Sequence, residues 1–467
     1  MTTDPTPDAA VPPPSAALPS TRLERLPRIT RTHVRWIVVL ASLFLCELAD
    51  IATLSYSAPA IRTDWHLSIT DLGVLTSATF LGMFVGALLG GRLADRYGRR
   101  TILIAAAAFF SACSILSALA PGYTVFAALR FLTGAGVQAT TGVLLVYAVE
   151  MFPRTSRGRY LSVMIALGGL GIPLIAGAAR LLVPLGPDGW RWVFVVGGVG
   201  LIPAVLGALL LPESVRWLEI HGRRAAAELL VDRLERDLIA RGVVLPEPEV
   251  RAAEPRHGLA ELRSSRYLRR TVVTSAVMVL AILSYYGFNS WVATLLVDRG
   301  FDTTQALTIS AVLALAPVLG ALAALPIIDR WERRRTSGVL SALVAVAMLV
   351  FALTHDTVAL VVAGFVAALL LQANTAVLYA YLPEVFPTAL RGIGSGIANS
   401  AGRIAGVANG FLIAGVAGVA GFTGVFLTTA VLVLLAGVVL WTFGVDTRGR
   451  ALDDIAGDGT VADPVHV

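Results

Sequence analysis

Twelve long apolar stretches follow one another along the chain, separated by short segments that carry most of its charge. Each stretch is long enough to cross a hydrocarbon core of about 30 Å, because a helix rises about 1.5 Å per residue. The pattern therefore predicts twelve transmembrane helices. They cover residues 34–58, 72–93, 101–120, 124–151, 161–184, 192–211, 271–297, 305–328, 337–353, 358–381, 392–419 and 422–443.

A polar stretch, residues 212–270, divides these helices into two sets of six. The predicted fold class is an all-α integral membrane protein with two six-helix bundles. We expect a disordered cytoplasmic N-terminal tail over 1–33, an N-terminal bundle over 34–211, a cytoplasmic central loop over 212–270, a C-terminal bundle over 271–444 and a cytoplasmic C-terminal tail over 445–467. The central loop is expected to form a pair of short amphipathic helices, of which the helical pattern covers 223–237.

Composition agrees with a polytopic membrane protein. The chain is 56% apolar and 15% charged, and its mean hydropathy is +0.76. A soluble protein could not carry so many apolar runs of about 20 residues. All 37 basic residues are arginine, which together with the abundant alanine, glycine and valine favours a bacterial source with a GC-rich genome.

The arginines indicate the orientation in the membrane. Alternate loops are rich in arginine, whereas the loops on the opposite side carry few, such as Arg62, Arg191 and Arg299. Positive charge is retained on the cytoplasmic side of a membrane. Both termini are therefore expected in the cytoplasm, with the protein in the inner (plasma) membrane. The basic residues before 34 run directly into the first helix, so we expect no cleaved signal peptide.

Several other function classes lack the residues they need. Cys46 and Cys113 both lie within apolar stretches and form neither a disulfide framework nor a metal site by themselves. The chain has no phosphate-binding glycine-rich motif ending in lysine, and no nucleophile–base set. The net charge of +6 belongs to the membrane loops and does not indicate nucleic-acid binding. We therefore expect no enzyme activity, no cofactor, no metal and no nucleic-acid partner.

An internal repeat relates the two halves at an offset of 234 residues. Glu150-Met-Phe-Pro-x-x-x-Arg157-Gly recurs as Glu384-Val-Phe-Pro-x-x-x-Arg391-Gly, and 384 − 150 = 234. The same offset carries Asp95-Arg96 onto Asp329-Arg330. Arg99-Arg100 is carried onto Arg333-Arg334 in the same way. Parallel six-helix repeats of this kind are found in secondary transporters.

The turn between the second and third helices reads Gly91-Arg-Leu-Ala-Asp95-Arg96-Tyr-Gly98-Arg99-Arg100. Its glycines are expected to permit a tight turn and close helix approach. This motif resembles the corresponding loop of the major facilitator superfamily of secondary transporters. We interpret this turn, its repeat and the Glu–Arg motifs as gating elements, in which Glu150 pairs with Arg99 or Arg100 and Glu384 with Arg333 or Arg334. The predicted gating residues are Gly91, Asp95, Arg96, Gly98, Arg99, Arg100, Glu150, Arg157, Asp329, Arg330, Arg333, Glu384 and Arg391.

Two carboxylates, Glu47 and Asp50, lie mid-way along the first helix and three residues apart, hence on one face. Charges inside a membrane are costly and usually functional. We predict that this pair binds the coupling proton. The alternative is a structural carboxylate paired with an arginine of a neighbouring helix.

Arg130 in the fourth helix and Arg403 in the eleventh are candidates for binding a substrate anion, since a guanidinium matches a carboxylate. Structural ion pairs are the alternative. Tyr286, Asn289 and Trp291 in the seventh helix, with Tyr379, could line a cavity and stack on a flat ligand. Phe288, Tyr285, Tyr147 and Asn374 belong to the same candidate cluster, for which helix packing is the alternative.

The Glu47-x-x-Asp50 pair resembles the first-helix acids of the aromatic acid:proton symporters, although Glu47 and Leu48 depart from their usual aspartate and glycine. Pro212-Glu-Ser-Val-Arg-Trp-Leu resembles an element of sugar-porter-like facilitators. The resemblance implies proton-coupled uptake of a small aromatic carboxylate by alternating access, with a small molecule, a proton and the bilayer as partners and a monomer as the working unit. The alternatives are a sugar or polyol:proton symporter, proton-linked efflux, and a transporter-like sensor without flux.

Overall fold

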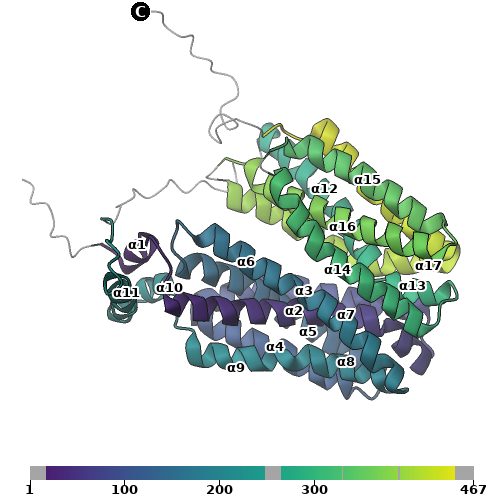
Figure 1. Cartoon of the computed structure of the whole chain (residues 1–467), viewed down its shortest axis with the longest axis horizontal. Helices are drawn as coiled ribbons and strands as arrows, with labels where there is room; N and C mark the ends of the chain where they lie inside the picture. Colours follow the sequence, from purple (N-terminus) through teal and green to yellow (C-terminus); the bar gives the residue numbers. More distant parts are fainter. Residues whose placement is uncertain (1–16, 248–263, 329, 388–389, 448–467) are drawn as a thin grey trace, which may run out of the picture.

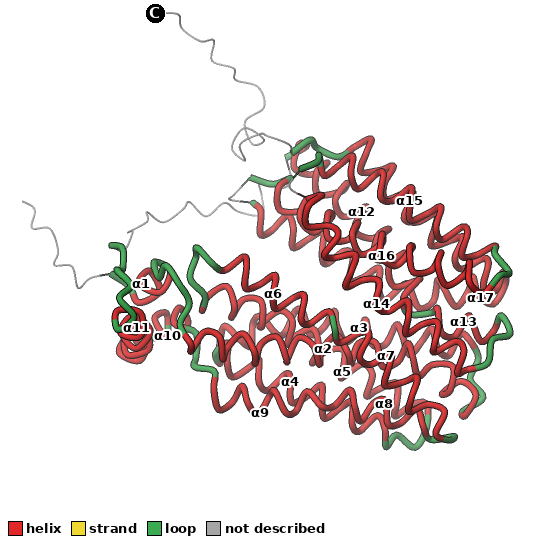
Figure 2. The backbone as a smooth tube through the Cα atoms, in the orientation of Figure 1, coloured by secondary structure: helices red, strands yellow, loops and turns green. Residues whose placement is uncertain are grey.

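The computed structural model describes residues 17–247, 264–328, 330–387 and 390–447. Within these ranges the regular structure is helical throughout and no strand occurs (Figure 2). The long helices form two groups that lie side by side (Figure 1). We call the group α2–α9 the first bundle and the group α12–α17 the second bundle.

Six membrane crossings make up the first bundle. Helices α2 to α5 each cross once, whereas the fifth and sixth crossings are divided by short irregular steps. Gly171 begins the second part of the fifth crossing and packs directly on the backbone of α2 at Leu45. The bounds are α2 Arg31–Asp64, α3 Ile69–Tyr97, α4 Arg99–Ala118, α5 Tyr123–Met151, α6 Arg157–Gly169 with α7 Gly171–Leu182 and a 3-10 turn Val183–Leu185, and α8 Gly189–Gly197 with a 3-10 turn Gly198–Gly200 and α9 Leu201–Leu210.

The second bundle also has six crossings, although the last two are joined across a kink in one helix, α17, Arg391–Phe443. Gly421 divides this helix, because its backbone adopts φ +57° and ψ −153°, a conformation that favours glycine. The two parts match the eleventh and twelfth predicted stretches, which confirms the twelve-helix fold class. The bounds are α12 Ser265–Asn289 with α13 Val292–Asp298, α14 Thr303–Ile328, α15 Arg333–Leu353, α16 Thr357–Tyr381 with a 3-10 turn Leu382–Glu384, and α17 Arg391–Phe443.

Three short helices lie together at one end of the first bundle, which we call the tail end. They are α1 Pro19–Glu24, α10 Val215–Ile220 and α11 Arg224–Ile239. The last two are the amphipathic pair expected in the central loop, whose residues 248–263 lie outside the described part. Helix α1 corrects the expectation of disorder at positions 19–24.

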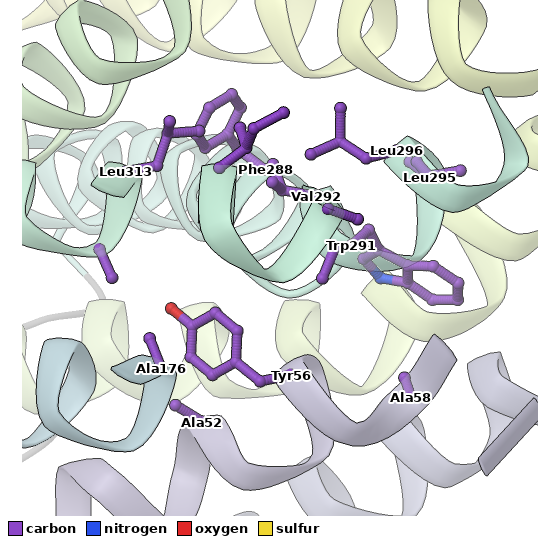
Figure 3. Close-up of a cluster of buried hydrophobic side chains, with 14 of the residues drawn as sticks. Ala52, Tyr56, Ala58, Ala176, Phe288, Trp291, Val292, Leu295, Leu296 and Leu313 are labelled. Carbon is purple, nitrogen blue, oxygen red and sulfur yellow. The ribbon is translucent and has the colours of Figure 1, made fainter. Parts of the chain in front are cut away.

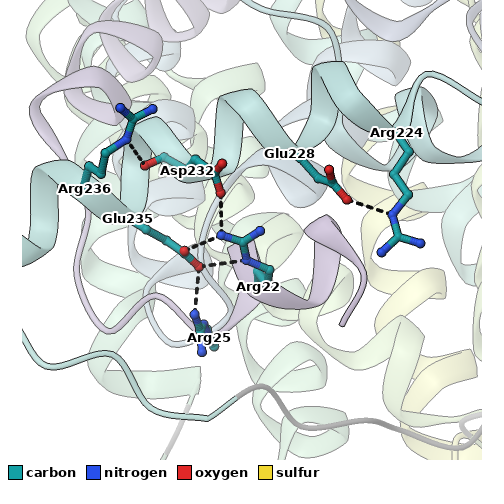
Figure 4. Close-up of polar contacts among 7 residues, drawn as sticks. All are labelled: Arg22, Arg25, Arg224, Glu228, Asp232, Glu235 and Arg236. Atoms are coloured by element: carbon teal, nitrogen blue, oxygen red, sulfur yellow. Dashed lines mark hydrogen bonds and ion pairs between the residues drawn. The ribbon is translucent and has the colours of Figure 1, made fainter. Parts of the chain in front are cut away.

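Helix α1 is ordered because it has both an apolar core and ion pairs. Leu23 is buried among the side chains of α11 and the first bundle. Arg22 pairs with Asp232 at 2.6 Å and with Glu235 at 2.5 Å, and Arg25 pairs with Glu235 at 2.9 Å (Figure 4). The hydrogen bonds that the Arg22 guanidinium donates to Glu235 raise the pKa of Arg22. The N-terminal segment was predicted to be disordered because it is rich in proline and charge, and its composition does not reveal partners that follow about two hundred residues later.

The bundles meet mainly where α3 packs on α17, α7 on α14 and α2 on α13; α14 also touches α2 and α6. Their axes lie close at the end opposite the tail end and diverge toward the tail end (Figure 1). In the described part of the chain, the polar contacts that we find between the bundles join Arg62 to Asp298 at 2.5 Å, Arg180 to Thr308 at 2.5 Å, and the Ser77 hydroxyl to the Val407 carbonyl at 2.8 Å. We call the Arg62–Asp298 contact the outer ion pair.

Candidate functional site

A cavity of about 120 Å³ lies at the centre of the interface between the bundles. Its walls come from α2, α3, α5 and α7 of the first bundle and from α12 and α13 of the second. Figure 3 shows this interface, with Tyr56 of α2 facing Phe288, Trp291 and Val292 of the second bundle. We call this space the central cavity.

Aromatic side chains form much of the cavity wall. Tyr56, Phe80, Tyr285, Tyr286 and Trp291 all line it. Phe80 and Tyr286 come from opposite bundles and meet edge to face, with ring centroids 4.6 Å apart. The Tyr285 hydroxyl donates to Gln372 at 3.1 Å. Rings arranged in this way suit a flat apolar ligand with a few polar atoms.

The wall of the second bundle is broken where α12 ends. The Asn289 side-chain amide donates back to the Tyr285 carbonyl at 2.9 Å, and α13 begins only at Val292. Ser290 and Trp291 therefore lie between two helices, and both line the cavity. A discontinuous helix at a site between bundles is a recurring feature of secondary transporters.

Arg130 is a buried side chain that reaches the cavity from α5. Its guanidinium donates to Ser117 at 2.8 Å and Thr133 at 3.1 Å, and lies over the Phe194 ring at 4.7 Å. Its Nη1 atom is 4.0 Å from Asp50 Oδ2. Arg130 is thus bound within the first bundle by hydroxyls, a ring and one carboxylate.

Asp50 is enclosed by the groups around Arg130. Its side chain is buried, and one oxygen accepts a hydrogen bond from the Ser114 hydroxyl. The other oxygen faces Arg130. Ser114 of α4 and Arg130 of α5 therefore compensate the Asp50 carboxylate. This arrangement matches the alternative stated above, a structural carboxylate paired with an arginine of a neighbouring helix.

Glu47 has fewer partners than Asp50. It is equally buried, and one oxygen accepts a hydrogen bond from the Thr141 hydroxyl. The other oxygen, Oε2, has no hydrogen-bond partner in the described part of the chain. Arg403 of the second bundle is the cation whose charge acts on Glu47. An ionised carboxylate in such a place is costly, because burial removes its hydration and a single hydroxyl replaces it.

Arg403 is half-buried in α17 and has neither an ion pair nor a hydrogen bond to the residues that the structure describes. Its charge also acts on Tyr379 of α16. Tyr379 is 43% exposed. Glu47 and Thr141 belong to the first bundle and Arg403 and Tyr379 to the second, and none of the four lines the central cavity.

The structure therefore divides the predicted substrate residues. Arg130, Tyr286, Asn289 and Trp291 line the central cavity, whereas Arg403 and Tyr379 do not.

Three further members of the predicted cluster follow the helix-packing alternative. Tyr147 donates to the Pro212 carbonyl at 2.7 Å inside the first bundle. Asn374 bonds Ser337 and Ser341 inside the second bundle. Phe288 packs on Phe351 and Phe426 in the core. The type of a residue, apolar or polar, does not by itself show whether its side chain faces the other bundle or the interior of its own bundle.

Sequence reasoning missed Thr141, which supplies the only hydrogen bond to Glu47 that we find among the described residues. A signal was available. Thr141 follows Arg130 by eleven residues, which is close to three full turns, so both lie on one face of α5. Because it shares a helix face with Arg130, the Thr141 hydroxyl could have been predicted as a hydrogen-bonding group of the site.

The gating motif at the tail end of the first bundle forms a compact polar cluster. Arg99 pairs with Asp95 at 2.6 Å and with Glu150 at 3.3 Å, and Ser214 donates to Glu150 at 2.5 Å. Gly98 turns the chain at φ +108°, and the Glu213 carboxylate lies where a Cβ would stand. The predicted tight turn is therefore found at Gly98.

Its neighbours take other roles. Arg100 donates its backbone N–H to Glu213 at 2.9 Å and its side chain to the Ala208 carbonyl. Arg96 lies 5.2 Å from the Tyr97 ring, and Arg157 lies 3.9 Å from Glu24. Gly91 has open space around it, so the expected close approach at this residue was wrong. The approach of α3 to α5 occurs instead at Gly82 and Gly86.

The repeat in the second bundle is simpler. Arg333 pairs with Glu384, which repeats the Arg99–Glu150 pair at the predicted offset. Arg330 is exposed, Arg391 begins α17, and Asp329 lies outside the described residues. Both Arg–Glu pairs join helices of a single bundle.

Metal binding has no support in the part of the chain that is described, where no group of three or more His, Cys, Asp or Glu side chains could hold an ion. Cys46 and Cys113 are both free and buried. The chemistry available to the site is therefore that of carboxylates, guanidinium groups, hydroxyls and aromatic rings.

A family model described as "Sugar (and other) transporter" matches residues 45–458. The chain belongs to this transporter family. It is a multi-pass membrane protein of the major facilitator superfamily, sugar-porter-like in sequence and fold, and it carries a small molecule rather than catalysing a reaction on one.

Relatives of this transporter match it over most of its length. The putative metabolite transport protein YyaJ of Bacillus subtilis is 35% identical, over 92% of this chain and 96% of the relative. The niacin transporter NiaP of Acinetobacter baylyi is 29% identical, over 93% and 98%. The 4-hydroxybenzoate transporter PcaK of Pseudomonas aeruginosa is 31% identical, over 67% and 70%.

Solved structures support the fold. A crystal structure of a D-xylose–proton symporter superimposes with a TM-score of 0.70, covering 90% of this chain and 99% of that one, at 21% identity. The likeness at this identity is one of architecture. It confirms the major facilitator fold that the helix count and the basic turn predicted.

Proposed function

We propose that this transporter takes up a small aromatic carboxylate together with a proton, by alternating access of the central site to the two sides of the membrane. One observation carries the proposal. Glu47 is buried with one uncompensated oxygen, and the cation that acts on it, Arg403, belongs to the other bundle and has no ion-pair partner among the described residues.

The proton and the substrate are coupled through Arg403 in this mechanism. A substrate carboxylate that pairs with the Arg403 guanidinium removes the cation that acts on Glu47. Glu47 then accepts a proton, because a buried carboxylate without a cation is costly when ionised. Release of the substrate restores the Glu47–Arg403 interaction and expels the proton, so the two equilibria are reciprocally linked.

Asp50 has a different role in this proposal. Its pair with Arg130 keeps the guanidinium in place at the edge of the central cavity. The aromatic wall formed by Tyr56, Tyr285 and Tyr286 receives the ring of the substrate. Phe80 of the same wall packs on Gly406, one turn along α17 from Arg403, so the cavity wall and Arg403 are neighbours. Two relatives support this substrate class, since niacin and 4-hydroxybenzoate, the compounds in their names, are both aromatic carboxylic acids.

In this proposal the arginine-rich tail end and both termini lie in the cytoplasm and the protein lies in the inner (plasma) membrane, because positive charge is retained on the cytoplasmic side. The bundles 34–211 and 271–444 are the two moving bodies of a monomer. The contact of the bundles through the outer ion pair, at the end opposite the tail end, supports an inward-facing state in this orientation. Opening on the outside requires the Arg62–Asp298 contact to break.

A neutral sugar or polyol is the second candidate substrate, and the central cavity itself favours it. Arg130 is the cation that lines the cavity, and hydroxyls and Asp50 already occupy it. Thr76, Thr79 and Asn289 could bind hydroxyls of a sugar there. The family model and the D-xylose–proton symporter fold are consistent with this alternative.

Uptake into proteoliposomes tests the proposal. Purified protein is reconstituted, an inward proton gradient is imposed, and radiolabelled benzoate, nicotinate, 4-hydroxybenzoate and xylose are supplied separately. We expect accumulation of a carboxylate that a protonophore abolishes and that Arg403→Gln prevents. Accumulation of xylose alone would replace the carboxylate by a sugar. Proton-driven loss from loaded vesicles, without uptake of any compound, would reverse the direction to efflux.

A further inference from the structure

On the cavity wall formed by the second bundle, two hydrogen-bonding atoms have no partner among the described residues. They are the indole Nε1 of Trp291 and the hydroxyl of Thr294, and both are buried and unsatisfied in the described part of the chain. Trp291 is 2% exposed and Thr294 is 1% exposed. Buried polar groups in folded proteins nearly always have a partner, so each of these atoms requires an explanation.

The helix break explains why the Thr294 hydroxyl is free. Several other buried threonines in the helices donate to a carbonyl three or four residues earlier, as Thr53 does to Asp50 at 2.7 Å and Thr140 to Gly136 at 2.9 Å. For Thr294 the fourth preceding residue is Ser290, which lies outside both α12 and α13. The local acceptor that normally satisfies a helical threonine is therefore displaced.

The Trp291 indole differs in the same way from another buried tryptophan. Trp190, which is fully buried in the first bundle, donates its Nε1–H to Asp64 at 3.1 Å. Trp291 lies at the break between α12 and α13, and its ring packs across the interface near Ala58 of α2 (Figure 3). Its ring belongs to the apolar core, and no described residue accepts a hydrogen bond from its Nε1–H.

Both residues with a free donor line the central cavity. Trp291 immediately precedes α13, and Thr294 lies in the first turn of that helix. Thr294 also lines a second pocket next to the outer ion pair, with Arg62, His66 and Asp298. The two donors thus lie at the outer wall of the cavity, on the bundle opposite Arg130.

We infer that Trp291 and Thr294 together bind a hydrogen-bond acceptor carried on the ring of the substrate, separate from its carboxylate. This inference rests on the proposed function and specifies its substrate as an aromatic acid with a ring nitrogen or a ring oxygen substituent. An indole N–H only donates, and a threonine hydroxyl can donate as well, so the pair selects an acceptor. The carboxylate is assigned to an arginine, whose charge and fork geometry bind it more strongly than two neutral donors.

A site built to hydrogen-bond a ligand discriminates strongly against an analogue that lacks the group, because its own polar atoms are then left unpaired. Nicotinate and 4-hydroxybenzoate have a ring acceptor, whereas benzoate has none. The wild-type protein is therefore expected to prefer the first two over benzoate. Trp291→Phe keeps the aromatic ring and removes the donor, and Thr294→Val keeps the shape and removes the hydroxyl.

The experiment measures binding of nicotinate, 4-hydroxybenzoate and benzoate to the purified full-length protein by calorimetry, and repeats it for both variants. Trp291→Phe should weaken nicotinate and 4-hydroxybenzoate about tenfold and benzoate less than about twofold, because it removes one hydrogen bond only from the first two. Thr294→Val should act in the same direction. Thr140→Val, whose hydroxyl is satisfied by Gly136, and Trp192→Phe, at an exposed site, are the matched controls and should leave the three affinities in their wild-type ratio.

Three results would overturn the inference, and they can be told apart. If benzoate is weakened as much as nicotinate, the two donors bind the carboxylate or act only in packing. If benzoate binds and neither variant changes any affinity, the donors do not contact substrate, while the proposed function stands. If no aromatic acid binds the wild-type protein but xylose does, the proposed function fails together with the inference.

Discussion

Glu47 and Asp50 lie one turn apart on the same face of α2, yet their surroundings differ. Asp50 is compensated by Ser114 and Arg130, which belong to its own bundle. Glu47 has one hydroxyl from its own bundle, and the cation that acts on it is part of the other bundle. A carboxylate compensated within one rigid body stays compensated when the bundles move. A carboxylate compensated across the interface does not, and this difference is what a transporter can use to couple a proton to a conformational change.

The largest expected effect concerns the stability of the Asp50–Arg130 pair. Arg130→Met leaves Asp50 buried without a cation, which should lower the free energy of unfolding by about 3–5 kcal/mol. The double variant Asp50→Asn/Arg130→Met should recover much of this loss, because no buried charge remains. The measurement is thermal unfolding in detergent, with Arg180→Met as the control for loss of an arginine at the interface. A stable Arg130→Met protein would show that Asp50 does not depend on this partner.

The second prediction separates the two acids by function. An inward gradient of two pH units can drive about 100-fold accumulation with one coupled proton, since each unit is worth about 1.4 kcal/mol. Glu47→Gln should lower this ratio to about one. Counterflow exchange of labelled substrate should continue, because exchange needs no net proton movement. Accumulation at the wild-type ratio in Glu47→Gln, with loss in Asp50→Asn, would assign the proton to Asp50 instead.

The third prediction tests the partner across the interface. Arg403→Lys keeps the positive charge near Glu47 and loses the planar fork, so KM for a carboxylate should rise about tenfold while proton coupling is retained. Arg403→Gln should abolish transport of carboxylates. The measurement is initial uptake rate against substrate concentration at fixed pH. An unchanged KM in Arg403→Lys would contradict direct binding of the substrate carboxylate.

The smallest expected effect is at the outer ion pair. Arg62 and Asp298 are each about one-third exposed, with side-chain exposures of 31% and 32%, so their contact should contribute about 0.2–1 kcal/mol. Arg62→Gln should raise the outward-open population by less than about fivefold, seen as faster labelling of a cysteine introduced at Thr294. Asp298→Asn should act alike, and the double variant should add little to either. Additive effects of the two changes would show that the residues act independently.

Much of the fold could be predicted from the sequence. Apolar length determined the twelve crossings, and even the merged helix α17 has its break at Gly421, between the eleventh and twelfth predicted stretches. The turn at Gly98 and the Arg99–Glu150 and Arg333–Glu384 pairs were also predictable, because each depends on residues near a helix end and on a repeat visible in the sequence. Helix α1 was not, because its partners Asp232 and Glu235 follow it by about two hundred residues.

The candidate site was only partly predictable. The sequence selected Glu47, Asp50, Arg130 and Arg403 from the cost of charge in a membrane. A charged side chain is costly anywhere in the hydrocarbon core. This cost therefore identifies the residues that need partners, but it does not identify those partners. Residue type alone could not show that the Asp50 carboxylate is compensated by two partners, whereas the buried Glu47 carboxylate has one oxygen without a hydrogen bond among the described residues.

The sequence by itself determined the number of crossings, the two related halves and the short list of charged residues that must be satisfied inside the membrane. The tertiary structure alone decided which helix faces meet across the two bundles. That choice separated Arg403 from the central cavity, gave Asp50 a partner in its own bundle, and left Trp291 and Thr294 with free donors at a helix break. The physical reason is that hydrophobic length acts along one helix, whereas the compensation of a buried polar group requires atoms from several helices to meet within hydrogen-bond distance.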